Sequence, residues 1–437
     1  MWQEKKEYPG VPIIRYIRDG QCQIIQVILM TADGGSAMIA ISSRLQRIKP
    51  SPSSMAGARA RELRAQGRDI VGLTAGEPDF DTPQHIQEAA WQAMQQGKTR
   101  YTDVGGTLEL REAIRQKFLR ENALDYAVNE IVAGTGAKQI VFNALMCTLE
   151  PGDEVIIPAP YWVSYPDITL LADGKPVMVT GLPEHGFKLQ PDDLEQAITP
   201  RTRWLLLNSP NNPSGATYTR EELVALGEVL KRHPHVWVMT DDIYEHLIYD
   251  GREFVTIAQA VPELKERTLT INGVSKSYAM TGWRIGYGAA PAELCKAMTK
   301  LQSQSTSNPN SVAQAAAVAA LNGPQDFIQT SRHSFQTRRD LVVETLNRID
   351  GIHAYRPEGA FYIFAACDAL FGLKTPDGHV IKSSDDWVMH LLDSENLAVL
   401  QGSAYGIPSH FRLSFAASEE QLLQGCSRVA RARASLS

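Results

Sequence analysis

Between two short apolar runs, at residues 269–271 and 285–289, the chain reads Asn272-Gly273-Val274-Ser275-Lys276-Ser277-Tyr278-Ala279-Met280-Thr281-Gly282-Trp283-Arg284-Ile285-Gly286. Both runs have the length and composition of buried strands. Lys276 stands among small residues, and Arg284 follows it eight positions later. A lysine that forms a Schiff base beside a bound phosphate needs such surroundings. The plain alternative is a surface lysine with an unrelated arginine, which leaves the flanking glycines and serines unexplained.

Short apolar runs alternate with helical periods outward from this stretch, from residue 70 onward. This alternation predicts an α/β fold whose mainly parallel sheet is covered by helices on both faces. The other predicted strands are residues 131–133, 154–157, 176–179, 204–207 and 236–239. The predicted helices are residues 107–122, 138–149, 219–232 and 293–303, and Thr219-Arg220-Glu221-Glu222 has the form of a capping box.

The pattern of predicted helices and strands changes after about residue 325. A long helical period at 325–348 precedes a strand at 361–366, a polar loop at 375–385 and a closing helix from Glu419. We therefore expect four parts: an unassigned N-terminal extension (1–37), an N-terminal arm with part of a small domain (38–75), a large cofactor-binding domain (76–325) and a small C-terminal domain (326–437). An amphipathic segment at 38–49 opens the second part, and residues 38–65 are expected to pack with the small α+β domain.

The composition is that of an ordinary soluble protein and favours small molecules as its partners. The 437 residues are 43% hydrophobic and 21% charged with a net charge of −6, which argues against disorder and against a nucleic-acid or anionic-membrane partner. The longest strongly apolar stretch near the start, residues 24–30, is too short to span a membrane. Five scattered cysteines without a C-x-x-C pair suggest neither a metal site nor disulfides, so a cytoplasmic location is expected.

The stretch around Lys276 resembles the pyridoxal-phosphate lysine signature of the fold-type I, class I aminotransferases. The resemblance extends over roughly residues 44–430 and is greatest to the bacterial aspartate aminotransferases that carry Gly-Glu-Pro-Asp-Phe, here residues 76–80. It implies a seven-stranded sheet, pyridoxal 5'-phosphate on Lys276 and ping-pong transfer of an amino group from an L-amino acid to a 2-oxo acid such as 2-oxoglutarate. Lys276 then also acts as general base, and two copies form a homodimer with shared active sites.

The turn Gly134-Thr135-Gly136-Ala137-Lys138 joins a predicted strand to a helix. Free backbone N–H groups at a helix N-terminus bind phosphate, although a simple strand-to-helix turn has the same form. The resemblance implies that this turn binds the cofactor phosphate through Gly136, Ala137 and Lys138, together with Ser275 and Arg284. It also implies that Tyr101 reaches the phosphate of the partner subunit. Gly273 stands where many relatives have a hydroxyl, so one phosphate hydrogen bond is expected to be missing.

A carboxylate at the carboxyl end of a strand is expected to hold the pyridine nitrogen of the cofactor in its protonated form. Asp241 and Asp242 both follow the strand predicted at 236–239, and either one can instead be a helix cap. The resemblance favours Asp241. It also places Tyr244 and Asn212 on the phenolic oxygen and stacks Trp162 on the ring, and it implies cis peptide bonds before Pro160 and Pro213.

Arg412 lies in the predicted strand segment Phe411-Arg412-Leu413-Ser414-Phe415 and needs an anionic partner. A structural salt bridge is one possibility, and the resemblance implies a clamp on the substrate α-carboxylate, aided by the N–H of Gly76. Trp162 and Asn212 are expected to contact substrate too. Residues 303–308 lack the arginine that binds the distal carboxylate in some relatives, so Lys138 with Ser51 or Ser53 is expected to replace it.

We therefore expect aspartate to be the preferred donor and aromatic donors to be tolerated. Alternatives within the same resemblance are an aromatic, alanine or prephenate aminotransferase and a pyridoxal-phosphate lyase. A sensor domain of a transcription regulator is disfavoured, because residues 1–37 are short and carry no basic patch.

Overall fold

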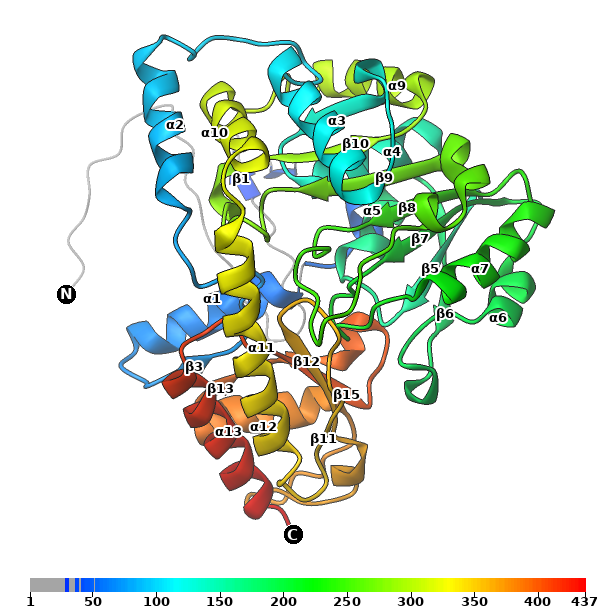
Figure 1. The fold of residues 1–437 in the computed structure, drawn as a ribbon. Coiled ribbons are helices and arrows are strands. Elements are labelled where there is room, and N and C mark those ends of the chain that lie inside the picture. The colour runs from blue at the N-terminus through cyan, green and yellow to red at the C-terminus, as the bar shows by residue number, and fades with distance from the viewer. Residues whose placement is uncertain (1–27, 31–35, 39–40, 51) are drawn as a thin grey trace. The chain divides into compact units, whose positions relative to one another are not determined.

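The computed structural model describes residues 28–30, 36–38, 41–50 and 52–437, which fall into two compact units, 1–49 and 50–437 (Figure 1). In the first unit β1 (Ile28–Met30) pairs antiparallel with β2 (Ser36–Met38), and a short 3-10 helix, η1, spans Ser43–Arg47. The amphipathic segment expected at 38–49 stays a prediction, because residues 39–40 lie outside the described part of the chain. Among the described residues of this segment, Ile41 and Leu45 are exposed and η1 buries no residue.

The second unit contains the seven-stranded sheet, in the order β4-β10-β9-β8-β7-β5-β6. Its strands are β4 (Ile131–Gly134), β5 (Glu154–Ala159), β6 (Lys175–Thr180), β7 (Thr202–Asn208), β8 (Trp237–Asp241), β9 (Thr268–Gly273) and β10 (Gly286–Ala289). All neighbouring strands are parallel except β10, which runs antiparallel to β4 and β9. The predicted strands and the mainly parallel sheet are confirmed.

Helices cover both faces of this sheet because successive side chains of a strand point to opposite sides. In β7, Trp204 and Leu206 join the cluster beneath α4 (Ala137–Thr148), α5 (Ser164–Leu171) and α9 (Ala292–Ser303). Leu205 and Leu207 join the opposite cluster with α6 (Pro191–Ala197), α7 (Arg220–Arg232) and α8 (Ile257–Ala260). The edge strand β6 departs from the expected burial on both faces, since its Met178 is exposed.

The β4 end of the sheet packs against α3 (Leu108–Asn122) and α10 (Ser311–Asn322), and α10 in turn contacts α2 (Gln84–Gln95). The predicted capping box at the start of α7 is confirmed: Thr219 Oγ1 accepts from the N–H of Glu222, and the Glu222 carboxylate accepts from the N–H of Thr219. Short 3-10 helices complete the connections at η2 (Val128–Glu130), η3 (Pro183–His185), η4 (Pro262–Arg267), η5 (Thr281–Trp283), η6 (Asp368–Leu370) and η7 (Gly402–Tyr405).

A second sheet, of four antiparallel strands, forms the α+β part in the order β11-β12-β15-β14. These strands are β11 (His353–Ala354), β12 (Tyr362–Ala366), β15 (His410–Ser414) and β14 (Leu400–Gln401), packed with α11 (Asp326–Leu346), α12 (Ser384–Glu395) and α13 (Glu419–Ala434). Residues from the N-terminal part join it. β3 (Val71–Gly72) pairs with β13 (Leu397–Ala398), and Ala60 and Leu63 of α1 (Pro52–Ala65) pack on Ala398 and its neighbours.

The domain boundaries at residues 76 and 326 stay predictions, because residues 50–437 form one compact unit. Among the helices described, none is both long and apolar enough to cross a membrane. The parallel strands β7 and β8 end at Asn208 and Asp241, at the edge where open α/β sheets bind their ligands.

Candidate active site

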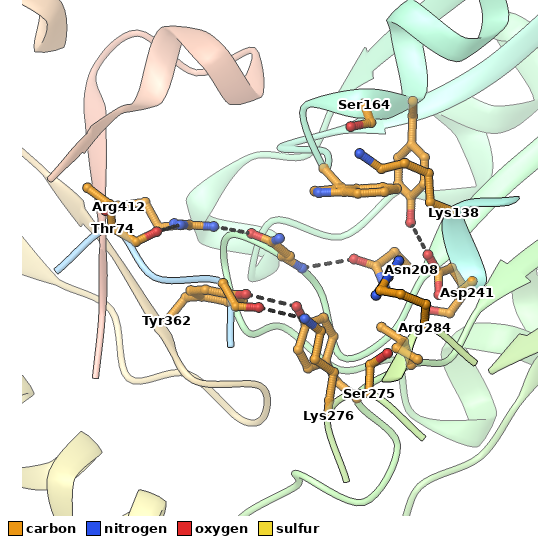
Figure 2. Close-up of a pocket in the computed structure, with 17 residues that line it drawn as sticks. Thr74, Lys138, Ser164, Asn208, Asp241, Ser275, Lys276, Arg284, Tyr362 and Arg412 are labelled. Atoms are coloured by element: carbon orange, nitrogen blue, oxygen red, sulfur yellow. Dashed lines mark hydrogen bonds between the residues drawn. The ribbon is translucent and has the colours of Figure 1, made fainter. Parts of the chain in front are cut away.

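A cavity of about 270 Å³ lies at the carboxyl ends of β7 and β8 (Figure 2). Of the predicted site residues whose side chains the structure describes, all line it except Gly136 and Tyr101. Gly136 caps the helix that borders the cavity, and Tyr101 is 90% exposed on the surface. Sequence reasoning missed the lining residues Thr74, Ser164, Tyr165, Asn208, Ile243 and Tyr362.

The charge of the cavity lining is strongly unbalanced. Lys138, Lys276, Arg284 and Arg412 contribute four basic groups, against the single carboxylate of Asp241. A cleft lined mainly by one sign of charge concentrates ligands of the opposite sign. The cavity is therefore built for anions.

At one end of the cavity, α4 begins at Ala137 behind Gly136, whose φ is +86°. A Cβ at Gly136 would lie 2.3 Å from Nη2 of Arg284, and a Cβ at Gly286 would lie 2.1 Å from the N of Ala137. Glycine is thus required at both positions for the guanidinium and the start of the helix to come together. Burial, with the charge of Arg284 second, lowers the pKa of Lys138. This arrangement of N–H groups and cations suits a phosphate.

Gly273, where many relatives have a residue with a hydroxyl group, has little space for a side chain. A Cβ at Gly273 would lie 3.0 Å from the carbonyl oxygen of Ile285 and 3.1 Å from Cα of Gly286, so a larger residue would press on the neighbouring backbone. Ser275 is buried and lines the cavity, where its hydroxyl is available to an anion.

Asp241, rather than Asp242, lines the cavity. Tyr165 donates its hydroxyl to Oδ2 of Asp241 at 2.8 Å, while the buried Oδ1 has no partner among the described residues. Asn208 donates to the main-chain oxygen of Asp241 at 2.7 Å. Burial raises the pKa of Asp241 to about 6. The unpartnered Oδ1 leaves room for a hydrogen bond from a ligand N–H, which the protonated pyridine nitrogen would supply.

Asp242 does not line the cavity and bonds to a neighbouring side chain instead. Thr240 Oγ1 donates to Oδ1 of Asp242 at 2.5 Å, and burial raises the pKa of the Asp242 carboxyl to about 7.

Lys276 extends from the turn after β9 into the cavity, where its Nζ donates to the carbonyl oxygen of Gly76 at 2.5 Å. Burial, followed by the charge of Arg284, lowers the pKa of Lys276 to about 8. The hydroxyl of Tyr244 lies 2.8 Å from that of Tyr362, and the ring of Tyr244 lies 5.9 Å from Nζ of Lys276. An amine with this pKa is partly neutral at physiological pH and is able to act as a nucleophile or a base.

Arg412 lies at the opposite end of the cavity and is 3% exposed. It donates to Oδ1 of Asn212 at 3.0 Å and to the carbonyl oxygen of Thr74 at 2.8 Å, and its Cζ lies 4.3 Å from the ring centre of Tyr362. Its Nε is buried without a partner in the described part of the chain. These contacts are neutral. No carboxylate among the described residues forms the structural salt bridge that the sequence allowed, so the guanidinium is suited to an anion from outside.

Trp162 forms the wall between these ends. Its ring lies edge to face with Tyr165, with ring centres 5.2 Å apart, and Nζ of Lys138 lies 4.7 Å from the centre of its ring. A planar ring bound in the cavity would find an aromatic surface here, with a cation close by.

The cis peptide bonds predicted before Pro160 and Pro213 are confirmed, and a third, unpredicted one joins Ser209 to Pro210. Ser51 lies outside the described residues, and so does the side chain of Ser53, so their expected contact with a distal carboxylate stays a prediction. Asn208 had a signal in the sequence that was overlooked, because it ends a buried parallel strand just as Asp241 does.

Comparisons with known proteins agree with this geometry. The model of the family "Aminotransferase class I and II" matches residues 68–429. A probable aspartate/prephenate aminotransferase of Rhizobium leguminosarum bv. phaseoli is 55% identical over 394 residues, which are 90% of this chain and 98% of that protein. The crystal structure of the aspartate aminotransferase from Rhizobium meliloti has a TM-score of 0.89 at 54% identity and covers 91% of this chain and 100% of its own. The Thermus thermophilus aspartate aminotransferase solved with maleate has a TM-score of 0.84 at 44% identity and covers 90% and 100%.

Proposed function

The chain belongs to the class I and II aminotransferases, and on this basis we propose that it uses pyridoxal 5'-phosphate, with L-aspartate as its preferred amino donor. The observation that carries this proposal is the cavity itself, in which four basic groups surround one buried carboxylate. Such a lining suits a phosphorylated cofactor together with a substrate that carries carboxylates. The aminotransferase activity itself follows from the family.

The described residues fit pyridoxal 5'-phosphate. Its phosphate would be held at the N-terminus of α4 with Ser275 and Arg284, and its ring against Trp162. The unpartnered Oδ1 of Asp241 suits the protonated pyridine nitrogen. When bound, this cofactor supplies an electron sink that stabilises negative charge at the substrate Cα.

Lys276 carries the cofactor and moves the proton. Its amine, with a pKa of about 8, would take the proton from the substrate Cα and pass it to C4′ of the cofactor. The donor leaves as a 2-oxo acid, and a second 2-oxo acid, such as 2-oxoglutarate, then accepts the amino group. Arg412 binds the α-carboxylate of both, with the N–H of Gly76 beside it, while Asn212 and Tyr244 orient the ring.

The preference for aspartate rests on Lys138 and on the relatives. Nζ of Lys138 lies over Trp162 at the cavity wall, where it can meet a distal carboxylate. Several relatives are named aspartate aminotransferases, and the Thermus thermophilus neighbour was solved with maleate, a dicarboxylate. A single ammonium holds a carboxylate less rigidly than a bidentate guanidinium does, so aromatic donors are tolerated.

Prephenate is the second candidate substrate, as an acceptor. The relatives from Rhizobium leguminosarum and Cereibacter sphaeroides are named aspartate/prephenate aminotransferases, at 55% and 54% identity. Prephenate is a 2-oxo acid with a second carboxylate, so the same pair of cations, Arg412 and Lys138, serves it.

We further propose a cytoplasmic homodimer. Tyr101 is exposed, as are Trp91 and Met94 of α2 and Leu108 at the start of α3, and a subunit interface would remove these apolar side chains from water. Tyr101 is expected to reach the phosphate of the partner subunit. Cys147, Cys295, Cys367 and Cys426 are free thiols, as a reducing compartment favours. Light scattering combined with assay tests the dimer, and a fully active monomer would contradict it.

A half-reaction screen tests the function. Each of the twenty amino acids is added to the loaded enzyme, and the cofactor absorbance is followed without any 2-oxo acid. Aspartate is expected to convert the chromophore to its amine form fastest, with no ammonia released. A lyase would instead release ammonia, and equal rates with all donors would refute the aspartate preference.

A further inference from the structure

A cluster of charged side chains lies outside the cavity, between α3 and the loop that follows β8. Lys117 is fully buried and contacts the carboxylate of Glu245 and, at 2.8 Å, Oδ1 of Asn122. Nζ of Lys117 also lies 3.7 Å from Oε2 of Glu121. Although burial acts to raise it, the hydrogen bond from His246 and the charge of Lys117 lower the pKa of Glu121 to about 2.

His246 connects this cluster to the segment that carries Lys276. Its Nε2 lies 2.9 Å from Oε2 of Glu121, and its Nδ1 lies 2.8 Å from Oγ of Ser277. Because an ionised carboxylate only accepts hydrogen bonds, Nε2 carries the proton and donates to Glu121. Nδ1 is thereby directed at the hydroxyl of Ser277, which is buried and directly follows Lys276.

The backbone around Lys276 has little regular structure of its own. Residues 274–280 belong to neither a helix nor a strand, and Ala279 has a φ of +51°. A few hydrogen bonds close this turn, among them one from the N–H of Met280 to the carbonyl oxygen of Ser275 at 3.1 Å. The direction of the Lys276 side chain therefore depends on what holds the residues beside it.

We propose that His246 is a positioning residue for Lys276: its Nδ1, left unprotonated by the contact of Nε2 with Glu121, holds the hydroxyl of Ser277 and thereby directs the lysine at Gly76 and into the cavity. This inference rests on the proposed function, in which Lys276 carries the cofactor and moves the proton. A small error in the position of a reacting amine has a large effect on rate, which makes the contact functionally important.

Three variants separate the two contacts of His246. His246→Asn keeps an amide near the position of Nδ1 and reaches Ser277, whereas His246→Gln keeps one near Nε2 and reaches Glu121. Ser277→Ala removes the hydroxyl alone. Thermal unfolding confirms that each variant is folded before the comparison is made.

The first readout uses the protein without cofactor. Acetic anhydride labels the neutral amine of Lys276, and mass spectrometry follows the labelling rate against pH. The groups that act electrostatically on Lys276 are Arg284, Glu77, Asp241 and Arg412, and none of them is altered. A lysine released toward water loses part of its desolvation, so its labelling midpoint moves upward in His246→Gln and Ser277→Ala. It stays near the wild-type value in His246→Asn.

The titratable groups that contact His246 are Glu121 from α3, Glu245 from its own loop and Tyr278 from the lysine segment, and Lys117 of α3 pairs with Glu121. These are unchanged in Ser277→Ala, so a shift in that variant is due to the lost hydroxyl.

The second readout is catalysis by the loaded enzyme. We expect kcat to fall roughly 10-fold to 100-fold in His246→Gln and Ser277→Ala, with KM for aspartate near the wild-type value. The isotope effect with aspartate deuterated at Cα is expected to rise, because proton transfer becomes the slow step. His246→Asn restores both.

His233 provides a matched control. Its Nε2 makes the same kind of contact, 2.8 Å from Oε1 of Glu195, at the end of α7 and away from Lys276. His233→Asn is expected to leave labelling and kcat unchanged. The proposal is overturned if glutamine at 246 rescues and asparagine does not, or if Ser277→Ala labels and turns over as the wild type does. If no cofactor can be fixed on Lys276 of the wild type, the proposed function fails, and the labelling of the cofactor-free protein still tests the positioning.

Discussion

Two buried arginines of this protein differ in what neutralises them. Arg339, in α11, is fully buried and makes two 2.7 Å hydrogen bonds to the carboxylate of Asp250 and one of 2.7 Å to Asp340. Arg412, in β15, is almost as buried but meets neutral oxygens of Asn212 and Thr74. The first arginine has its counter-charges within the chain. The second has a place for an anion from outside, as binding a substrate carboxylate requires.

This difference indicates that stability and activity depend on different charged residues. A buried charge without a partner costs free energy, so Arg412 destabilises the folded protein when no anion is bound. Substitutions in the cavity should therefore cost activity, and substitutions at Arg339 should cost stability. The following predictions test that separation.

Lys276→Ala should have the largest effect, on the cavity side. We expect kcat to fall by roughly 10⁴-fold or more, because both the covalent anchor and the base are lost, while cofactor still binds. Borohydride reduction of the wild type should fix the cofactor on Lys276, as peptide mapping can establish. Labelling of another lysine, or a large fall in the unfolding temperature of Lys276→Ala, would contradict the separation.

Arg412→Leu and Arg339→Leu test the comparison directly. Arg412→Leu should weaken transition-state stabilisation with aspartate, measured from kcat/KM, by about 3 to 5 kcal/mol. The reason is the loss of two charge-assisted hydrogen bonds to the α-carboxylate. The free energy of unfolding of this variant should not fall. Arg339→Leu should lower the free energy of unfolding by about 2 to 4 kcal/mol, because Asp250 and Asp340 lose their partner. Urea unfolding and steady-state kinetics measure both, and equal destabilisation by the two substitutions would break the comparison.

Asp241 and Asp242 extend the comparison to two neighbouring carboxylates. Asp241→Asn should reduce kcat roughly 100-fold, because the pyridine nitrogen loses its partner, and Asp242→Asn should leave kcat near the wild-type value. In the folded protein without cofactor the pKa values of about 6 and about 7 lie above the unfolded value, so the folded state binds more protons. These two groups therefore make stability fall as pH rises from about 4 to 7.

Removing either carboxyl should flatten that decline, by on the order of 3 kcal/mol for Asp241 and about 4 kcal/mol for Asp242. Urea unfolding of the cofactor-free protein at several pH values measures it. A variant Asp242→Asn that destabilises equally at every pH would show that the carboxyl is needed for its hydrogen bonds rather than tolerated as a charge.

Lys138→Ala should have the smallest effect and should depend on the donor. If Lys138 makes one charge-assisted contact with a distal carboxylate, the substitution weakens transition-state stabilisation with aspartate, measured from kcat/KM, by on the order of 1.5 to 3 kcal/mol. It costs much less for phenylalanine, which has no such group. Equal losses with both donors would place Lys138 with the phosphate, and the aspartate preference would have to be withdrawn.

The sequence by itself determined the helices and strands, and it predicted Lys276 as the reactive lysine. The continuous apolar run in β7, the capping box at Thr219 and the small residues around Lys276 are each patterns that extend over only a few positions. Strand pleat, helix capping and turn chemistry act over those same distances, which is why these features can be read locally.

The tertiary structure decided which groups meet. Lys276 and Gly76 are 200 positions apart, as are Arg412 and Asn212, and Arg412 and Thr74 are 338 positions apart. No local pattern reports that Tyr165 donates to Asp241 while Asp242 bonds elsewhere, or that Arg412 finds no carboxylate among the described residues. These outcomes depend on how layers of helices and strands pack. Packing brings distant side chains within hydrogen-bond distance and determines which groups surround each charged side chain.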